Sequence, residues 1–118
     1  LNAVVNPITA IARARNRVVL TEAGRALARA ILEEVVEAAK KSGLELDLEK
    51  LYEVVMRNVA SVADNYSSMA QDVLSGRKTE VDFINGYIAR ILGSRSVNWV
   101  LTQLVHLIEE AGSQHHAY

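Results

Sequence analysis

The chain has 118 residues, of which 50% are hydrophobic and 23% are charged, and it contains one proline. This composition predicts one folded domain with a sizeable core, and it excludes a second domain and an intrinsically disordered chain. Thirteen basic and fourteen acidic side chains give a net charge of −1, without the basic excess typical of proteins that bind nucleic acid. There is no cysteine, which excludes disulfides and thiolate metal sites.

No apolar run approaches the roughly 18 to 20 residues of a membrane-spanning helix, and no signal-like leader opens the chain. We therefore expect a soluble protein of the cytoplasm, and the lack of cysteine is compatible with that location. The chain starts at Leu1 without a methionine, which we interpret as the start of a fragment of a longer protein.

The first segment, residues 1–12, has a helix-compatible composition, with Asn2 and Asn6 one turn apart and so on one face. Pro7 leaves two structures open. Either the helix is continuous and bent at the proline, or a helix starts there with Asn6 as its N-cap.

A basic connector, residues 13–20, leads to the longest predicted helix, residues 21–42. The arginines of the connector form either a solvated surface or an anion site, and Asn16 is the connector residue that we expect to face a ligand. The expected N-cap of the helix is Thr21 or the residue before it, and Gly43 ends the helix. The apolar stripe of this helix is predicted to consist of Leu27, Ile31, Val35 and Ala38. Its solvent-exposed face, or wet side, is predicted to consist of Glu33, Glu34, Glu37, Lys40 and Lys41.

The next helix carries apolar residues at helical spacing and has Asp47 as its expected N-cap. A short helix then starts at Ser67 or Ser68, and Ser68 with Gln71 has the spacing of a capping box.

Thr79 and Asp82 also have capping-box spacing, which predicts a helix from there to about residue 92. The last helix is expected over residues 97–111, with its inward side formed by Val100, Leu101, Leu104, Val105 and Ile108. No segment has the pattern of a strand. The chain is therefore predicted to fold as a compact, multi-helix, all-α domain without a sheet.

Residues 65–86, NYSSMAQDVLSGRKTEVDFING, are poor in apolar positions and place Asn65, Ser68 and Glu80 between helical segments, so a site is expected there. The segment contains Ser-Ser-Met-x-Gln-Asp, a basic turn, Thr-Glu-Val-Asp and Asn-Gly, and the chain opens with Asn-x-x-x-Asn-Pro-Ile-Thr-Ala. These two motifs, in this order, resemble the C-terminal domain of ketopantoate reductase, the NADPH-dependent 2-dehydropantoate 2-reductase. The resemblance covers about residues 2–110.

The resemblance implies a helical domain of the 6-phosphogluconate dehydrogenase C-terminal-like type over residues 1–118, with residues 112–118 as a flexible tail. It implies a substrate-binding wall for the reduction of 2-dehydropantoate to pantoate, on the route to pantothenate and coenzyme A. The implied partners are a 2-oxo acid, a second copy in a homodimer, and an N-terminal Rossmann domain that binds most of the NADPH. The six glycines nowhere have Gly-x-Gly-x-x-Gly spacing, so this fragment alone is expected to be inactive.

The resemblance also assigns roles to polar residues. Glu80 is implied to be the catalytic carboxylate and to contact the nicotinamide ribose, whereas periodicity alone makes it an acid in the first turn of a helix. The general-acid lysine would precede Leu1. The implied substrate-binding residues are Asn2, Asn6, Asn16 and Ser68, with Asn65 supporting the same wall. Amides and hydroxyls suit a ligand that offers both carbonyl and hydroxyl oxygens, although periodicity alone would assign these residues to caps and turns.

Residues 90–98 depart from the family pattern, which has a longer loop here, through either a natural deletion or residues absent from the chain. His106 has only Glu110 one turn away as a further ligand, and His115 and His116 read as a tail or tag remnant, so no metal site is expected.

Two alternative functions stay open. The same fold could act on another 2-oxo acid, or the chain could be a non-catalytic helical dimerisation or interaction module.

Overall fold

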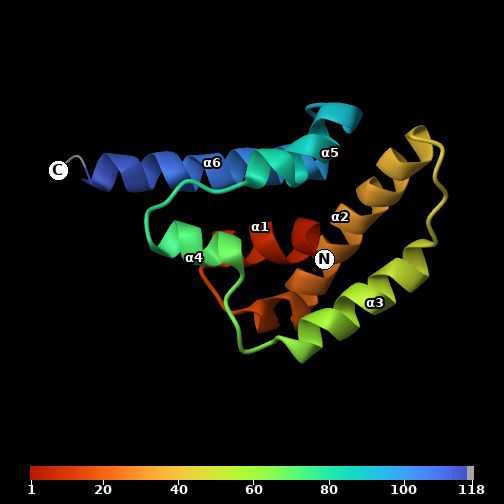
Figure 1. The fold of residues 1–118 in the computed structure, drawn as a ribbon, viewed down its shortest axis with the longest axis horizontal. Coiled ribbons are helices and arrows are strands. Elements are labelled where there is room, and N and C mark those ends of the chain that lie inside the picture. The colour runs from red at the N-terminus through yellow and green to blue at the C-terminus, as the bar shows by residue number, and fades with distance from the viewer. Residues whose placement is uncertain (117–118) are drawn as a thin grey trace.

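The helices of the domain pack around the first of them (Figure 1). In chain order they are α1 (Asn2–Ala12), the 3-10 helix η1 (Asn16–Leu20), α2 (Glu22–Lys41), α3 (Leu48–Ser61), α4 (Ser68–Leu74), the 3-10 helix η2 (Val81–Phe83), α5 (Asn85–Leu92) and α6 (Val97–His116). The computed structural model describes residues 1–116, with side chains through residue 112, and within these residues it contains no strand. The predicted all-α fold without a sheet is confirmed.

Helix α1 is covered on every side. Its residues 4–10 are all buried, and it contacts η1, α2, α4 and α6. Figure 1 shows α4 lying against α1, with α5 and α6 together along one side of the molecule and α2 and α3 extending as a hairpin on the other. A helix that is buried around its whole circumference needs such cover. The site described below lies where α4 meets this central helix.

Pro7 lies inside α1, so the continuous helix is confirmed, and Asn6 is not its N-cap because that position belongs to Leu1. Proline has no N–H, which leaves the carbonyl of Ala3 without its intrahelical donor. Asn85, the first residue of α5, replaces that donor: its Nδ2 lies 2.9 Å from the Ala3 carbonyl oxygen. One hydrogen bond therefore joins the Asn-Pro motif at the start of the chain to the Asn-Gly motif near its end.

The predicted caps of α2 and α3 are confirmed. The Thr21 hydroxyl accepts from the Gly24 N–H at 3.1 Å, and the Asp47 carboxylate accepts from the Lys50 N–H at 3.2 Å. Gly43 follows the end of α2 with a φ of 85°, a left-handed conformation that glycine adopts without strain.

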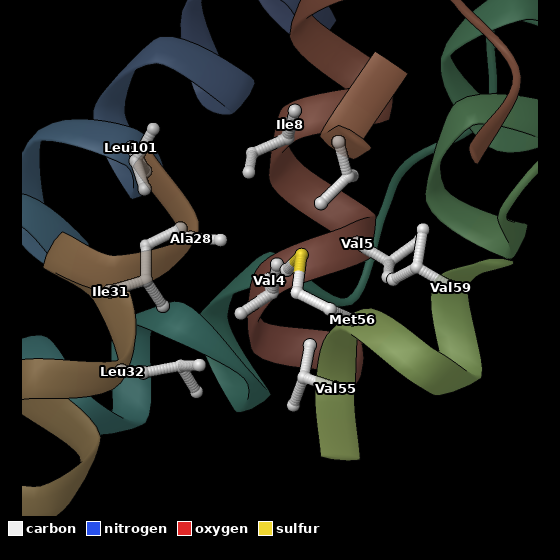
Figure 2. Close-up of a cluster of buried hydrophobic side chains, with 11 residues drawn as sticks. Val4, Val5, Ile8, Ala28, Ile31, Leu32, Val55, Met56, Val59 and Leu101 are labelled. Atoms are coloured by element: carbon white, nitrogen blue, oxygen red, sulfur yellow. The ribbon is translucent and has the colours of Figure 1, made fainter. Parts of the chain in front are cut away.

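A hydrophobic cluster fills the space between α1, α2, α3 and α6, and Figure 2 shows its side chains converging from these helices. Its buried members are Val4, Val5, Ile8, Val19, Ala28, Ile31, Leu32, Val55, Met56, Val59 and Leu101. A second, smaller cluster joins α1, α4, η2 and α6 and consists of Ala10, Met69, Val73, Val81 and Val105. The first cluster holds the α2–α3 hairpin to α1, and the second one supports the site.

The predicted inward faces of α2 and α6 are confirmed in part, since Ile31, Ala38, Leu101 and Val105 are buried, and wrong at their edges. Leu27, Val100 and Leu104, which we expected to be inward, are 40%, 46% and 39% exposed. On α2 a glycine takes the inward position at the start of the helix, because a Cβ at Gly24 would lie only 2.3 Å from the Val18 carbonyl oxygen. Hydrophobic periodicity favours leucine at such a face, whereas close approach of two backbones requires the smallest residue.

Glu34, predicted on the wet side of α2, caps the N-terminus of α6 instead. Its carboxylate accepts from the Val97 and Asn98 N–H groups at 2.8 and 2.9 Å and from Asn98 Nδ2 at 2.8 Å. These bonds require Asn98 to face inward, and Val100 and Leu104 turn outward as a result, while Leu101 and Val105 stay buried. Asn98 Oδ1 also accepts from Asn85 Nδ2 at 2.8 Å, so one chain of hydrogen bonds links α2, α6, α5 and α1.

The helix predicted from Thr79 to about residue 92 is wrong in its first part, where the structure has η2, then a break, then α5. Thr79 Oγ1 accepts from the Val81 N–H at 3.3 Å in a local turn. Asp82 is not its capping partner, because the Asp82 carboxylate bonds to His106 Nε2 at 2.7 Å. A tertiary contact with α6 therefore replaces the local capping box.

Helix α6 continues to His116, past the predicted end at residue 111. Residues 117–118 of the expected flexible tail lie outside the described residues, as do the side chains of His115 and His116. None of the helices that the structure describes is long and apolar enough to cross a membrane.

Candidate functional site

A hollow of about 280 Å³ opens where α1, α4 and the segment before η2 meet. Its lining residues are Asn6, Ser68, Met69, Asp72, Lys78, Glu80 and Ile84. The second hydrophobic cluster lies behind it, through Met69. The structure thus brings together three of the predicted site residues, Asn6, Ser68 and Glu80, from three separate segments of the chain.

Asn6 is the most deeply buried polar residue of this hollow, with 4% of its surface exposed. Its backbone carbonyl accepts from Thr9 Oγ1 at 3.2 Å, but its side-chain amide has no partner among the described residues. The enclosed side-chain atoms without a partner in the described part of the chain are Asn16 Oδ1 and Asn85 Oδ1, so the Asn6 amide, which is not one of them, reaches the hollow. Because this amide lines a hollow, it is a donor and acceptor available to a ligand.

The two serines at the start of α4 have different partners. Ser67, not Ser68, caps the helix: its Oγ accepts from the Ala70 N–H at 3.0 Å. Ser67 Oγ also lies 2.6 Å from Thr9 Oγ1, which donates to the Val5 carbonyl at 2.6 Å. Since Thr9 donates to that carbonyl, Ser67 must donate to Thr9, and this buried bond fixes α4 against α1.

The predicted capping box of Ser68 with Gln71 is wrong, since Gln71 Nε2 donates to the Tyr66 carbonyl at 3.1 Å. Capping by the preceding serine leaves the Ser68 hydroxyl available to the hollow that it lines. The Ser-Ser pair therefore combines one structural hydroxyl with one that faces the site.

Three charged side chains complete the lining. Glu80 and Lys78 are exposed, and Asp72, on α4, is partly buried and pairs with Arg77 Nε at 3.2 Å. The sequence analysis assigned no role in the site to Lys78, which it treated only as part of a basic turn, or to Asp72, which it gave only as part of a motif. The position of Asp72 four residues after Ser68, and so on the same face of a helix, is the signal that could have identified it.

Asn2, Asn16 and Asn65 do not line the hollow. Asn2 is exposed on α1, one turn before Asn6. Asn16 is buried, its Nδ2 donates to the Val62 carbonyl at 3.1 Å, and its N–H donates to the Asn65 carbonyl at 2.8 Å. Asn16 and Asn65 thus join η1 to the segment between α3 and α4, and their contact with a substrate stays a prediction.

Two of the three arginines of the connector, Arg15 and Arg17, are held by the same segment. Arg17 forms an ion pair with Asp64, and Arg15 donates to the Asp64 carbonyl at 2.7 Å and lies over the ring of Tyr66. These contacts favour the solvated-surface interpretation of the basic connector over an anion site, because the guanidinium groups already have partners.

A second hollow, of about 420 Å³, lies on the other side of residues 78–82. Here His106 Nδ1 bonds to Glu109 Oε1 at 2.7 Å, while its Nε2 bonds to Asp82. The bond to Asp82, helped by the one to Glu109, raises the pKa of His106 above its ordinary value against the opposing effect of burial. Burial also acts to raise the pKa of Glu109, but the Thr79 and His106 hydrogen bonds outweigh it and lower that pKa.

In the first hollow, Glu80 is the residue suited to a nucleotide cofactor, because its exposed carboxylate can accept hydrogen bonds from ribose hydroxyls. Within the part of the chain whose side chains are described, no group of three or more histidine or acidic side chains could hold a metal ion.

The fold and the hollow define an all-α domain that presents amide, hydroxyl and carboxylate groups to a small polar ligand. The family described as ketopantoate reductase PanE/ApbA C terminal matches residues 1–109. The chain therefore belongs to the ketopantoate reductase C-terminal domain family, as the two sequence motifs predicted.

Individual relatives agree with this assignment. A 2-dehydropantoate 2-reductase from Vibrio cholerae serotype O1 is 32% identical over 118 residues, which span 97% of this chain but 40% of the relative. A structure of D-mandelate dehydrogenase with NADH and anilino(oxo)acetate matches with a TM-score of 0.88 and 25% identity, over 95% of this chain and 49% of that one. A PanE/ApbA family ketopantoate reductase from Ralstonia eutropha matches with a TM-score of 0.79 and 27% identity, over 95% of this chain and 39% of that one.

Proposed function

We propose that this chain supplies the substrate-binding wall of an NADPH-dependent 2-dehydropantoate 2-reductase of the cytoplasm, in the route to pantothenate and coenzyme A. One observation carries the proposal: Asn6, Ser68 and Glu80 line the same hollow, and the amide of the buried Asn6 has no partner among the described residues. The family match and the relatives named 2-dehydropantoate 2-reductase support it. The rest of the reductase, namely an N-terminal Rossmann domain and a general-acid lysine just before Leu1, is part of the proposal.

The substrate presents a carboxylate, a 2-oxo group and a hydroxyl. In this proposal the Asn6 amide and the Ser68 hydroxyl donate to its oxygens, and the Lys78 ammonium attracts its carboxylate. Glu80 accepts from a hydroxyl, of the substrate or of the nicotinamide ribose, and so orients the reacting pair. When bound, NADPH supplies the hydride that reduces the 2-oxo carbon, and the lysine donates the proton that completes the hydroxyl.

The test is oxidation of NADPH, dependent on 2-dehydropantoate, by the full-length protein that contains this chain. Glu80→Ala should lower kcat/KM at least about 100-fold, equivalent to about 2.7 kcal/mol of transition-state stabilisation. Glu45→Ala removes an exposed carboxylate outside the hollow and should leave kcat/KM unchanged. A full-length protein that binds NADPH but does not turn over 2-dehydropantoate would contradict this substrate. The 118-residue chain alone should show no turnover.

A second candidate function is the reduction of a different 2-oxo acid with NADH. The higher TM-score to D-mandelate dehydrogenase than to the Ralstonia eutropha reductase favours this candidate. It is tested by assaying 2-dehydropantoate and an aryl 2-oxo acid such as phenylglyoxylate side by side, each with NADPH and NADH. A larger kcat/KM for the aryl substrate would replace the first proposal. If no 2-oxo acid is reduced and neither cofactor binds, a non-catalytic helical interaction module becomes the better account.

We also propose that the protein is a homodimer through the outer face of α6. Trp99, Val100, Leu104 and Leu107 are between 39% and 61% exposed and line a shallow hollow of about 350 Å³ on this helix. A helix face that pairs with its own copy around a two-fold axis buries the same residues twice. Leu107→Glu should convert a dimer to a monomer in sedimentation, whereas a wild-type monomer would contradict the proposal.

A further inference from the structure

The carboxylate of Glu80 is positioned by its backbone. The side chain is exposed, and it makes no hydrogen bond with any described residue. On its C-terminal side Val81 is fully buried in the second hydrophobic cluster. On its N-terminal side the Thr79 N–H donates to Glu109 Oε2 at 2.6 Å. The direction of the Glu80 side chain therefore depends on what holds residues 79 and 81.

The bond to Thr79 belongs to a longer chain of contacts. The other oxygen of Glu109 bonds to His106, and the far nitrogen of His106 bonds to Asp82. The segment that carries Glu80 is consequently fastened to α6 at both ends, at Thr79 and at Asp82, by two side chains of one helix. The side chains of Glu109 and His106 are 13% and 25% exposed, so these bonds are partly shielded from water.

We propose that Glu109, with His106, is a positioning residue of the site: it fixes the Thr79 backbone and so aims the Glu80 carboxylate into the hollow beside Asn6 and Ser68. The proposal rests on the role of Glu80 proposed above. Glu109 itself lines the second hollow, on the far side of the segment, and does not contact the first one. It acts on catalysis only through the segment that it holds.

A conservative variant separates this role from a general contribution to stability. Glu109→Ala removes both carboxylate oxygens, the one that binds Thr79 and the one that binds His106. Glu109→Gln keeps the hydrogen bonds to Thr79 and His106, and that of His106 to Asp82, when His106 is neutral. The glutamine carbonyl accepts from the Thr79 N–H, its amide donates to His106 Nδ1, and His106 Nε2–H donates to Asp82. Glu110→Ala is the matched control, since it removes the neighbouring, exposed carboxylate of α6.

The first readout is hydrogen exchange in residues 79–83 of the full-length protein. Glu109→Ala should speed exchange there at least about tenfold, while Glu109→Gln and Glu110→Ala should leave it near the wild-type rate. Unchanged exchange in Glu109→Ala would show that Glu109 does not hold the segment, and would overturn the proposal whatever the enzyme does.

The second readout is kcat/KM in a double-mutant cycle. Glu109→Ala should lower kcat/KM at least about tenfold and Glu109→Gln less than about twofold. Combined with Glu80→Ala, Glu109→Ala should lower it no further, because a residue that acts through Glu80 has nothing left to position. Additive losses would overturn the proposal. If Glu80→Ala alone has no effect, the proposed role of Glu80 fails and positioning for catalysis fails with it, while hydrogen exchange still decides whether Glu109 holds the segment.

Discussion

Two buried asparagines of this domain differ in what their side chains contact. The amide of Asn85 donates both of its hydrogens, to the Ala3 carbonyl and to Asn98 Oδ1. The amide of Asn6 has no partner in the described part of the chain and faces a hollow. The amide nitrogen of the first asparagine therefore contributes to the folded state, although its Oδ1 is buried without a partner in the described part of the chain, and the amide of the second one is open to water or to a ligand in the hollow.

Substitution by leucine, which has a similar size, should separate these roles. Asn85→Leu leaves the Ala3 carbonyl and Asn98 Oδ1 without their donor and should lower the free energy of unfolding by about 3 kcal/mol. Asn6→Leu removes an unpartnered amide and should leave the free energy of unfolding unchanged or raise it, while lowering kcat/KM at least about tenfold. Urea titrations and the reductase assay measure the two effects. A clear loss of stability in Asn6→Leu would mean that this amide has a partner in the folded protein.

At the scale of elements, the contact between α2 and η1 depends on one glycine. A Cβ on Gly24 would lie 2.3 Å from the Val18 carbonyl oxygen and 2.6 Å from that of Val19, and both atoms belong to the backbone. Gly24→Ala should therefore force the elements apart and lower the free energy of unfolding by about 3 kcal/mol, despite the better helix propensity of alanine.

Gly112→Ala is the matched control for this prediction. Gly112 also lies in a helix, and a Cβ there meets nothing within 4 Å. The substitution should be neutral or raise the free energy of unfolding by up to about 1 kcal/mol. Equal effects of the two substitutions in thermal unfolding would contradict a close approach at Gly24.

The contact of η2 with α6 should make stability depend on pH. His106 faces carboxylates at both ring nitrogens, Asp82 and Glu109, and only the doubly protonated ring donates to both. Other charged groups line the same hollow, from the end of α1, the loop before η2 and α6, namely Arg13, Arg77, Lys78 and Glu110. The neighbouring carboxylates set the direction of the effect, since the pKa of His106 is raised.

A raised pKa means that the folded state binds the His106 proton more tightly than the unfolded state does. The resulting stability is fully present below the ordinary pKa of 6.5 and is lost as the pH rises through the pKa of the folded state. For Glu109 the pKa is lowered, so its contribution is present above 4.5 and is lost as the pH falls through its folded-state pKa. The cluster is therefore most stabilising between these two transitions.

The measurement compares wild type with His106→Gln by urea unfolding at about pH 6 and about pH 9. The free energy of unfolding of the wild type should exceed that of His106→Gln by less at the higher pH. The free energy of unfolding of the variant should change less with pH over this interval. A difference between the two proteins that stays constant with pH would contradict a protonated His106 between the carboxylates.

Some elements could be predicted from the sequence because local signals determine them. The caps at Thr21 and Asp47 and the glycine after α2 follow from chemistry within four residues of the chain. The site residues Asn6, Ser68 and Glu80 were identifiable only because two motifs resemble a family. Their periodicity alone favoured caps and turns.

Other features depend on contacts between distant residues, which periodicity does not carry. Asp82 has the right spacing to cap with Thr79, yet it bonds to a histidine 24 residues away. Glu34 has the pattern of a solvated residue, yet it caps a helix 63 residues further on. In both cases a tertiary hydrogen bond overrides a local preference that is worth at most about 1 kcal/mol.

At the scale of the whole molecule, the bonds of Glu34 connect α2 to the helices of the C-terminal half. Glu34→Ala leaves the Val97 and Asn98 N–H groups and the Asn98 amide without their acceptor, and should lower the free energy of unfolding by about 3 kcal/mol. Glu37→Ala, which removes an exposed carboxylate from the same helix, should change it by less than about 0.5 kcal/mol.

Both variants should unfold in a single transition with a wild-type m-value, because the first hydrophobic cluster still joins α1, α2, α3 and α6 across the domain. Urea unfolding followed by circular dichroism and by Trp99 fluorescence tests this expectation. Separate transitions with the two probes would show that the α2–α3 hairpin and the C-terminal helices unfold independently.

The bond between Ala3 and Asn85 has a consequence for the order in which the protein is made. It spans 82 residues, and no donor within α1 can stand in for it, because Pro7 has no N–H. During synthesis α1 emerges before Asn85, so the Ala3 carbonyl can acquire this side-chain donor only after residue 85 has followed. Helix α1 therefore depends for this bond on a segment that is made much later, and a nascent chain cut short before residue 85 lacks it.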